Sequence, residues 1–224
     1  MAGRTVAIIG GHGKIAQLLT KQLVQEGDQV RSIVRNPAHS EELRALGAEP
    51  VTADIEIMDA RNLAPALKGC DAVVFAAGAG PGSGARRKRT VDYGGSILSQ
   101  QAALEAGVPR FVQISAISVK RAIDPAAGDV WREYVRAKKD ADKRLRRTAL
   151  KWTILRPGLL TDDPGTGLIA AALFLPHELA SGGQIPRADV ATSIVATLNL
   201  DSTIRKEIDI VSGDTPIVEA LGSL

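Results

Sequence analysis

The chain has 224 residues, of which 45% are hydrophobic and 24% charged, so it has ample material for a buried core and is unlike disordered chains. Its longest apolar run, residues 168–175, is far shorter than the roughly twenty residues of a membrane-spanning helix. The net charge is only +3 and aromatic residues make up 3%, which argues against nucleic-acid binding because stacking platforms are missing.

The single cysteine, Cys70, rules out an intramolecular disulfide and a cysteine-based metal cluster. The three histidines have no carboxylate at metal-ligand spacing, so we expect no metal site. The first four residues lead directly into an apolar strand without the hydrophobic region of a secretory signal. We therefore expect a cytoplasmic protein that associates with no membrane.

Apolar runs alternate along the chain with segments of helical period. Several of the runs are continuous in Val, Ile and Ala, which is typical of parallel strands covered by helices on both faces. Strands are predicted at residues 5–9, 29–34, 49–53, 72–77, 110–114, 151–155 and 207–211. Helices are predicted at residues 13–27, 92–106, 131–148 and 188–200, with Thr215 capping a short last helix that begins at Pro216.

This alternation predicts an α/β protein with a Rossmann-type doubly wound parallel sheet. We expect one domain over residues 1–224, in which residues 157–224 contribute the lid on the substrate side. Two long stretches, residues 78–84 and 157–186, are predicted to be irregular, and loops of this kind border the ligand crevice in such folds.

The segment between the first strand and the first helix is rich in glycine. Its pattern Gly11-x-Gly13-x-x-Ala16 matches the dinucleotide fingerprint, in which small residues permit a tight turn and a close approach to pyrophosphate. An ordinary strand-to-helix turn is the alternative, but the strand before and the helix after favour a nucleotide site. The residues of this loop are Gly10, Gly11, His12, Gly13, Lys14, Ile15 and Ala16.

The second strand ends in Arg35-Asn36-Pro37, where an NAD site would carry an acidic residue for the ribose 2′-hydroxyl. A guanidinium can form charge-assisted bonds to a 2′-phosphate, so Arg35 favours NADP(H) over NAD as the cofactor. A solvated arginine is the alternative.

Later strand ends add three further expectations. Asp54 and Ile55 are expected near the adenine, and Ala76-Ala77-Gly78 is expected to let the dinucleotide pass closely. The run Arg86-Arg87-Lys88-Arg89 is interpreted as a solvated helix start, with an anion-binding role as the alternative.

On the predicted helix 131–148, Tyr134 and Lys138 share the stripe that Ala141 and Leu145 turn toward the sheet. An ammonium beside a phenol lowers the pKa of the tyrosine and brings it closer to acid/base work at neutral pH. A lysine that lies along apolar surface and reaches water with its head is the alternative. Ser115 directly follows the fifth strand and is expected to face the crevice, although a serine there is also common turn chemistry.

With these motifs, together with Arg156-Pro157-Gly158, residues 185–191 and residues 212–217, the chain resembles the short-chain dehydrogenase/reductase superfamily over nearly its whole length. The similarity is to the atypical NAD(P)-binding branch that includes NmrA-like and biliverdin-reductase-B-like proteins. The resemblance implies that Tyr134 exchanges a proton with substrate, that Ser115 positions the reacting oxygen and that Lys138 tunes the tyrosine and binds the nicotinamide ribose.

The resemblance further implies that backbone around Pro157, Gly158 and Leu160 meets the carboxamide end of the cofactor. Two features depart from the family pattern: position 16 is alanine instead of glycine, and 19 residues separate Ser115 from Tyr134. Many atypical members bind the dinucleotide with an incomplete catalytic set, so activity has to be argued from the site.

Three functions are consistent with these residues. The first is an NADP-dependent oxidoreductase or epimerase-like enzyme acting on a small carbonyl or hydroxyl substrate, with Tyr134 as the proton donor. The second is a nucleotide-sensing module that binds NADP(H) and changes its contacts with a partner protein. The third is a flavin or quinone reductase that needs no catalytic tyrosine. Monomer and homodimer both remain open.

Overall fold

A nine-stranded sheet forms the centre of the computed structural model, which describes residues 3–120, 122–123 and 126–224. The strand order is β11-β8-β10-β6-β5-β4-β1-β2-β3, and all neighbours from β3 to β10 are parallel. At the other edge, β8 runs antiparallel to both β10 and β11. The strands of the sheet are β1 (Thr5–Ile9), β2 (Gln29–Val34), β3 (Ala48–Thr52), β4 (Ala72–Phe75), β5 (Arg110–Ile114), β6 (Lys151–Pro157), β8 (Leu168–Ala172), β10 (Lys206–Ser212) and β11 (Thr215–Pro216).

Helices connect these strands, and a small parallel pair, β7 (Leu159–Thr161) with β9 (Gln184–Pro186), lies outside the main sheet. The α-helices are α1 (Lys14–Gln25), α2 (Ser40–Ala45), α3 (Ala60–Leu67), α4 (Ala85–Arg87), α5 (Ser96–Glu105), α6 (Asp129–Leu145), α7 (His177–Ala180), α8 (Arg187–Asn199) and α9 (Ile217–Gly222). Between α4 and α5 the chain forms a π-helix, η2 (Lys88–Gly95), and short 3₁₀ turns cover Pro37–His39, Ile117–Lys120 and Asp201–Thr203.

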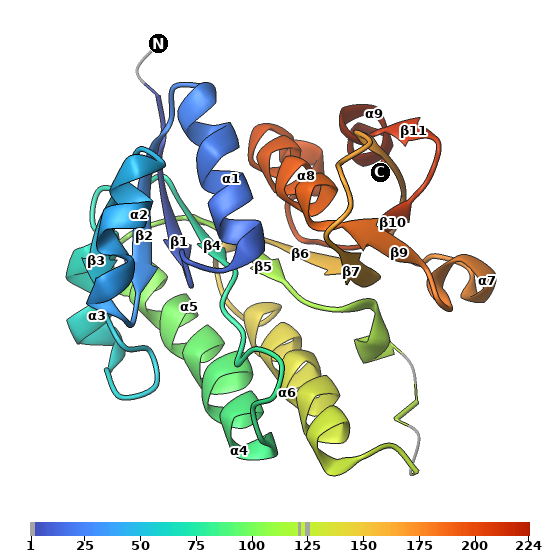
Figure 1. The fold of residues 1–224 in the computed structure, drawn as a ribbon, viewed down its shortest axis with the longest axis horizontal. Coiled ribbons are helices and arrows are strands. Elements are labelled where there is room, and N and C mark those ends of the chain that lie inside the picture. Colours follow the sequence, from blue (N-terminus) through green and yellow to red (C-terminus); the bar gives the residue numbers. More distant parts are fainter. Residues whose placement is uncertain (1–2, 121, 124–125) are drawn as a thin grey trace.

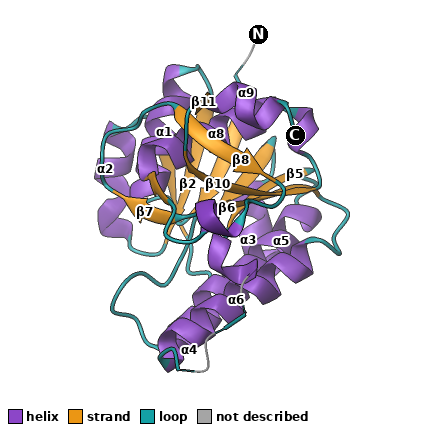
Figure 2. Cartoon of the chain, turned by 90° about the vertical axis from the view of Figure 1, so that its right-hand side faces the viewer, coloured by secondary structure: helices purple, strands orange, loops and turns teal. Residues whose placement is uncertain are grey.

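Two apolar layers cover the two faces of the sheet, because successive strand residues point to opposite sides. Val6 and Ile8 of β1 pack into the layer formed with α1, α2, α8 and α9. Ala7 and Ile9 pack into the layer formed with α3, α5 and α6. Figure 1 shows α1 and α8 on one side of the strands and α5 and α6 on the other, and Figure 2 shows the second group below the sheet. The sheet is therefore buried on both faces, as its uninterrupted apolar strands require.

The carboxyl ends of three central strands lie level with one another. Ile9 at the end of β1 pairs with Ile33 of β2 on one side and with Phe75 of β4 on the other. The chain order reverses between β1 and β4, and in open α/β sheets the ligand crevice forms outside the strand ends at this switch point. The loops that follow β1, β2 and β4 therefore meet at one place.

The sequence predicts the parallel core accurately and the periphery less well. The strands at 5–9, 29–34 and 110–114 are confirmed residue for residue, and the irregular stretch 78–84 is also confirmed. The prediction that 157–186 is irregular is wrong, because β7, β8, α7 and β9 form there. The predicted helix 92–106 is in fact the π-helix followed by α5, and the helices α2 and α3 were not predicted.

The end of the chain also corrects a prediction. Thr215 lies in β11 and does not cap the last helix, which begins at Ile217 after Pro216. Pro216 pairs with Leu168 of β8, so the edge of the sheet takes up the two residues that would otherwise form the cap.

Gly10 and Gly69 differ in why a side chain is unfavourable at each position: Gly69 through its backbone conformation alone, and Gly10 also through a steric clash. Both have a positive φ, 83° and 80°, but a Cβ at Gly10 would lie 2.7 Å from Ala77 Cα, whereas one at Gly69 would meet nothing within 4 Å. We predict that Gly69→Ala costs about 1 kcal/mol of unfolding free energy through backbone strain. Gly10→Ala should lose a further ~1–3 kcal/mol through overpacking. Urea unfolding of both variants checks this, and equal losses would contradict it.

Candidate functional site

A cavity of about 320 Å³ lies at the switch point of the sheet. It is bounded by the loops that follow β1, β2, β3 and β4, together with part of α4 and η2. Ten of the residues predicted to bind the cofactor line it. They are Gly10, His12, Gly13, Arg35, Asn36, Asp54, Ile55, Ala76, Ala77 and Gly78.

The glycines of the first loop serve two different purposes. The amides of Gly10 and Gly11 both donate to Ile33 O at 3.0 Å, and a Cβ at Gly11 would lie 2.6 Å from Ser32 Cβ. Packing against β2 and β4 therefore accounts for these two positions. Gly13 has an ordinary φ of −65°, and a Cβ there would come no closer than 3.3 Å to a neighbour. Its lack of a side chain keeps the cavity open above the loop.

Helix α1 begins directly behind this loop and leaves its amino end without a cap. Gly13 supplies no side-chain hydrogen bond, and the first turn contains no acidic residue. The first amides of the helix and the positive end of its dipole are therefore available to an anion. The loop, the open cavity above Gly13 and the uncapped helix fit the pyrophosphate of a dinucleotide.

Lys14, the first residue of α1, joins this loop to the C-terminal part of the chain. Its Nζ lies 2.5 Å from Asp162, and the same carboxylate pairs with Arg187 Nη1 at 2.7 Å. Hydrogen bonds from Lys14 and charge from both cations outweigh desolvation and lower the pKa of Asp162. Lys14 and its neighbour Ile15 lie beside the cavity and do not line it.

The cavity carries charge where the loops after β2 and β3 border it. Arg35 Nη1 lies 2.9 Å from Glu56 Oε2, so Arg35 is an ion-pair partner and not simply a solvated side chain. The Asp54 carboxylate accepts from the amide of Glu56 at 2.9 Å, which fixes the turn after β3. The imidazole of His12 stacks on His39 with ring centroids 3.5 Å apart and contributes to the cavity wall.

The segment predicted to meet the carboxamide lies elsewhere, at the end of β6. The amide of Gly158 donates to Ile210 O at 3.0 Å, and a Cβ there would lie 2.2 Å from Gly183 O. Leu160 pairs with Ile185 in the small β7–β9 sheet, and Pro157 is buried at the strand end. Packing accounts for Gly158, and the proposed contact of Pro157, Gly158 and Leu160 with a cofactor remains a prediction.

Tyr134 is half-buried and lines a second cavity of about 540 Å³. The Gly/Pro-rich loop 81–83 and the start of α6 form its other walls. The Lys88 ammonium lies 5.5 Å from the centre of the Tyr134 ring, and the half-exposed Trp131 ring lies 5.4 Å from it. Tyr134 therefore faces a space of ligand size, separate from the cavity at the switch point of the sheet.

Lys138 is buried one turn further along α6, with 6% of its surface exposed. Its Nζ lies 3.3 Å from Asp92 Oδ1 and donates to Ile114 O at 3.1 Å. Burial opposes the charged form, but Asp92, Tyr134 and Asp142 outweigh it and raise the pKa of Lys138. The snorkelling alternative is therefore wrong, because the ammonium is held inside the protein by an ion pair.

Asp92 is a site residue that the sequence analysis missed. It is 1% exposed, belongs to η2, and also accepts from the Ala79 amide at 3.2 Å. It thus connects Lys138 to the loop after β4. A single aspartate in Thr90-Val91-Asp92-Tyr93 carries no signal in the sequence until the fold shows that it is buried beside a lysine.

The pKa of Tyr134 departs from the sequence-based expectation. Burial raises it most, Lys138 lowers it as expected, and Asp92 and Asp142 raise it, so the pKa lies above its ordinary value of 10. Tyr134 is consequently protonated at neutral pH. The raised pKa leaves little phenolate at neutral pH, so Tyr134 is not a ready base.

Ser115 does not face the crevice as expected. It is 3% exposed, and its Oγ donates to Asp142 Oδ2 at 2.7 Å, while Gln113 Nε2 donates to Asp142 Oδ1 at 2.6 Å. Burial raises the pKa of Asp142 to about 6, against hydrogen bonds from Ser115 and Gln113 and charge from Arg156 and Lys138. Asp142 lies on the buried face of α6, so its hydrogen bond with Ser115 turns the serine hydroxyl toward the interior.

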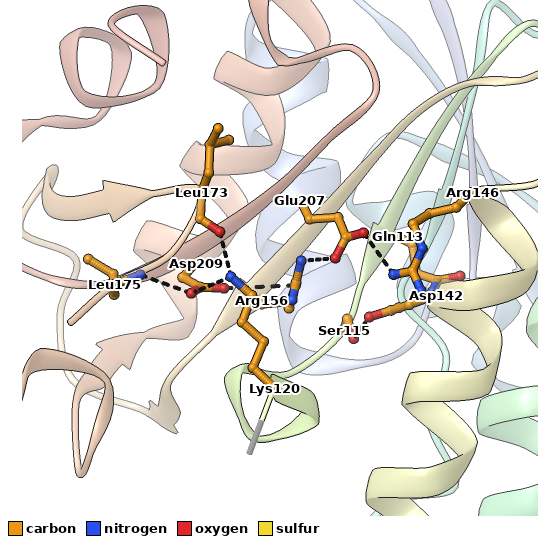
Figure 3. A network of polar contacts seen from close by, with 10 residues as sticks. All are labelled: Gln113, Ser115, Lys120, Asp142, Arg146, Arg156, Leu173, Leu175, Glu207 and Asp209. Carbon is orange, nitrogen blue, oxygen red and sulfur yellow. Dashed lines mark hydrogen bonds and ion pairs between the residues drawn. The ribbon is translucent and has the colours of Figure 1, made fainter. Parts of the chain in front are cut away.

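Figure 3 shows a second buried group of charges beside this pair, where β6 meets β10. Arg156 pairs with Glu207 and lies 3.8 Å from Asp209, whose other oxygen lies 2.9 Å from Lys120 Nζ. Lys120 also donates to the carbonyl oxygen of Leu173. These bonds hold the turn after Ser115 against the C-terminal strands.

Residues 10–201 match the NAD(P)H-binding family, and the chain belongs to this family. A Bacillus subtilis (strain 168) protein described as an uncharacterized sugar epimerase is 38% identical over 98% of this chain and 99% of its own length.

Two solved structures share the fold. A Bacillus halodurans protein, provisionally described as an NAD-dependent epimerase/dehydratase, is 34% identical with a TM-score of 0.89 over 99% of this chain and 100% of that one. A Lactococcus lactis oxidoreductase is 29% identical with a TM-score of 0.82 over 98% and 96%. These likenesses bear out the resemblance drawn from the motifs.

In the part of the chain that the structure describes, no helix combines the length and the apolar character that crossing a membrane requires. No three His, Cys, Asp or Glu side chains among the described residues are grouped so that they could hold a metal ion.

The raised pKa of Asp142 predicts a pH dependence of stability. Between pH 4 and pH 6 the folded chain holds a proton on Asp142 that the unfolded chain releases, because the pKa rises from 3.8 to about 6 on folding. The unfolding free energy of the wild type should therefore fall with rising pH over this window relative to Asp142→Asn, by on the order of 1–3 kcal/mol, and change no further above pH 7.

Urea unfolding at half-unit pH steps measures this difference. Asp163→Asn, at an exposed carboxylate, is the matched control for loss of one negative charge. A difference between wild type and Asp142→Asn that stays constant from pH 4 to pH 7 would refute the assignment.

Proposed function

We propose that the chain is an NADP-dependent oxidoreductase or epimerase-like enzyme that acts on a small carbonyl or hydroxyl substrate. The observation that carries the proposal is the buried Asp92–Lys138 ion pair beside Tyr134, because burying an ion-paired ammonium next to a phenol costs free energy, and such arrangements cluster at functional sites. The descriptions of similar proteins as a sugar epimerase and an oxidoreductase support the same class.

The cofactor is held, in this proposal, by the residues that the crevice brings together. The loop from Gly10 to Gly13 adjoins the pyrophosphate, and the backbone amides of His12, Lys14 and Ile15 donate to it. Arg35 holds the 2′-phosphate, while Asn36 fixes the turn behind it by accepting from the Ala38 amide at 3.1 Å. Asp54 and Ile55 adjoin the adenine, and residues 76–78 line its path. Lys138 binds the nicotinamide ribose, and backbone at 157–160 adjoins the carboxamide. When bound, the nicotinamide supplies or accepts the hydride.

Tyr134 has the properties of the proton donor. Its raised pKa keeps the hydroxyl protonated, and Lys138 stabilises the phenolate that remains once the proton has passed to a substrate oxygen. The Ser115 hydroxyl is turned into the interior by its hydrogen bond to Asp142, so its orientation does not support the role of positioning the reacting oxygen that the resemblance implies. The role of Tyr134 is consistent with a chain that protonates a carbonyl oxygen during reduction.

The space beside Tyr134 indicates what kind of substrate would fit. A cavity of about 540 Å³ is of the size of small-molecule sites, and its walls combine Trp131 and Val130 with the backbone of a Gly/Pro-rich loop. We propose a small organic molecule as the ligand. None of residues 157–224 lines this cavity, so their role as the substrate-side lid of a single domain remains a separate prediction. In the same proposal the protein works in the cytoplasm, without nucleic acid or membrane, as a monomer or homodimer.

We predict that Tyr134→Phe lowers turnover by at least about a hundredfold, because general acid catalysis by a positioned side chain contributes roughly 10²–10⁴-fold. The NADPH dissociation constant should change less than twofold. The experiment follows NADPH absorbance with a panel of aldehydes, ketones and keto sugars, and measures NADPH binding by calorimetry.

Tyr93→Phe is the matched control, because Tyr93 packs under the Arg89 guanidinium at 4.0 Å and does not line the cavity. Full turnover in Tyr134→Phe would remove the tyrosine from the mechanism and favour flavin or quinone reduction. Tight NADPH binding by the wild type without turnover on any member of the panel would favour a nucleotide-sensing module.

A further inference from the structure

Glu56 lies between two arginines where the loops after β2 and β3 border the crevice. Its Oε2 is 2.9 Å from Arg35 Nη1 and 2.8 Å from Arg87 Nη2, and its Oε1 accepts from Thr90 Oγ1 at 2.7 Å. All except Thr90 line the crevice cavity. Two guanidiniums from distant parts of the chain, the end of β2 and the end of α4, thus converge on one oxygen atom.

Arg87 is set apart from the other cations of its run. Lys88 donates to Gly80 O at 2.8 Å, and Arg89 pairs with Asp140 at 2.8 Å, so both are turned toward other parts of the surface. Arg86 is exposed and does not line the crevice. Arg87 alone among the four lines the crevice, which corrects the interpretation of the whole run as a solvated helix start.

The two arginines carry more positive charge than Glu56 neutralises, so this part of the cavity can attract another anion. Each guanidinium has five N–H donors and uses one on Glu56, so both side chains keep further donors, and both line the same cavity. The Glu56 side chain is 17% exposed, whereas Arg35 and Arg87 are 55% and 41% exposed. Asp54 and His39 also adjoin the cavity, but the Asp54 carboxylate is engaged by the Glu56 amide.

Glu56 is held as a carboxylate. Desolvation works against its charge, but hydrogen bonds from Arg87 and Thr90 and charge from Arg87 and Arg35 lower its pKa below the ordinary value. A phosphate monoester carries about −1.5 to −2 charge at pH 7 and three acceptor oxygens, so it is a stronger partner for paired guanidiniums than one carboxylate. Its approach would also be opposed by the negative charge of Glu56.

We propose that Arg87 is a second specificity residue for the 2′-phosphate of the cofactor and that Glu56 is the internal anion that the phosphate displaces. The inference rests on the proposed NADP-binding function and assigns to it two residues beyond Arg35. Glu56 holds the guanidiniums together before the ligand arrives and thereby limits the entropy lost on binding. It also limits how strongly the paired charges attract other anions.

The test compares 2′,5′-ADP with 5′-ADP by calorimetry, because the two probes differ only in the 2′-phosphate and neither reaches Tyr134. We expect Arg87→Gln to weaken binding of 2′,5′-ADP about tenfold, as for loss of a charge-assisted bond, and to change 5′-ADP less than twofold. Arg86→Gln, one residue away in the same run, is the matched control and should change neither.

Glu56→Gln keeps the size of the side chain and removes its charge. We expect it to raise the preference for 2′,5′-ADP over 5′-ADP about threefold or more, because the phosphate no longer competes with a carboxylate. A fall in this preference would overturn the displaced-anion role and leave Glu56 a clamp that positions the arginines. Thermal unfolding of each variant checks that the fold is retained.

The outcomes separate this inference from the proposed function. If the wild type binds neither probe and neither NADPH nor NADH, the nucleotide site itself fails. If the wild type prefers 2′,5′-ADP but Arg87→Gln equals Arg86→Gln in both affinities, NADP binding stands and only the role of Arg87 is refuted.

Discussion

The site depends on keeping a charged ammonium where there is almost no water. Lys138 is 6% exposed and Asp92 is 1% exposed, so the two opposite charges depend on each other and on the backbone partners Ile114 O and the Ala79 amide in place of water. This pair fixes α6 against the ends of β4 and β5, and with it the position of Tyr134. The π-helix that carries Asp92 is part of the same arrangement. It packs so closely on the turn after β3 that a Cβ at Gly95 would lie 2.6 Å from Ile55 Cδ1, and Ile55 is in turn a wall of the dinucleotide crevice.

A second set of buried charges, which also compensate one another, anchors the C-terminal segment. Arg156 and Asp209 are nearly inaccessible to water and lie on neighbouring parallel strands, where their register sets them side by side. Lys120 then ties the turn after β5 to this pair, and Asp142 draws Ser115 toward the interior. Because the two sets lie on either side of the end of β5, the strand end is held from the nucleotide half and from the C-terminal half together. That arrangement explains how the C-terminal strands of the sheet are held in a fixed position beside the end of β5.

Much of the fold could be predicted because it depends on short-range patterns. Continuous apolar runs such as residues 5–9 and 110–114 identify parallel strands, and the glycine loop between a strand and a helix locates the nucleotide crevice. The prediction for residues 157–186 failed because the strands there are short and form only by pairing with other segments: β8 pairs with β10, and β7 pairs with β9. The same limit applies to the site. Arg35, Tyr134 and Lys138 stand out by position or spacing, but Asp92, Asp142, Glu56 and Arg87 acquire meaning only from neighbours distant in the chain.

The Asp92–Lys138 pair and the group of Glu56 with its two arginines both match a carboxylate with cations, but they differ in burial. That difference determines whether the carboxylate can separate from its partners. In each group a carboxylate neutralises cations before any ligand is present. Asp92 has a side-chain exposure of 2% and lies next to a cation exposed by only 7%, so separating them would leave two unsolvated charges. Glu56 has 17% exposure and its arginines about half, so its carboxylate can move into water when a stronger anion arrives. The first pair is therefore suited to a permanent role, holding an ammonium beside the tyrosine through every step. The second is suited to exchange, which is the property that the proposed selection of a 2′-phosphorylated dinucleotide would use.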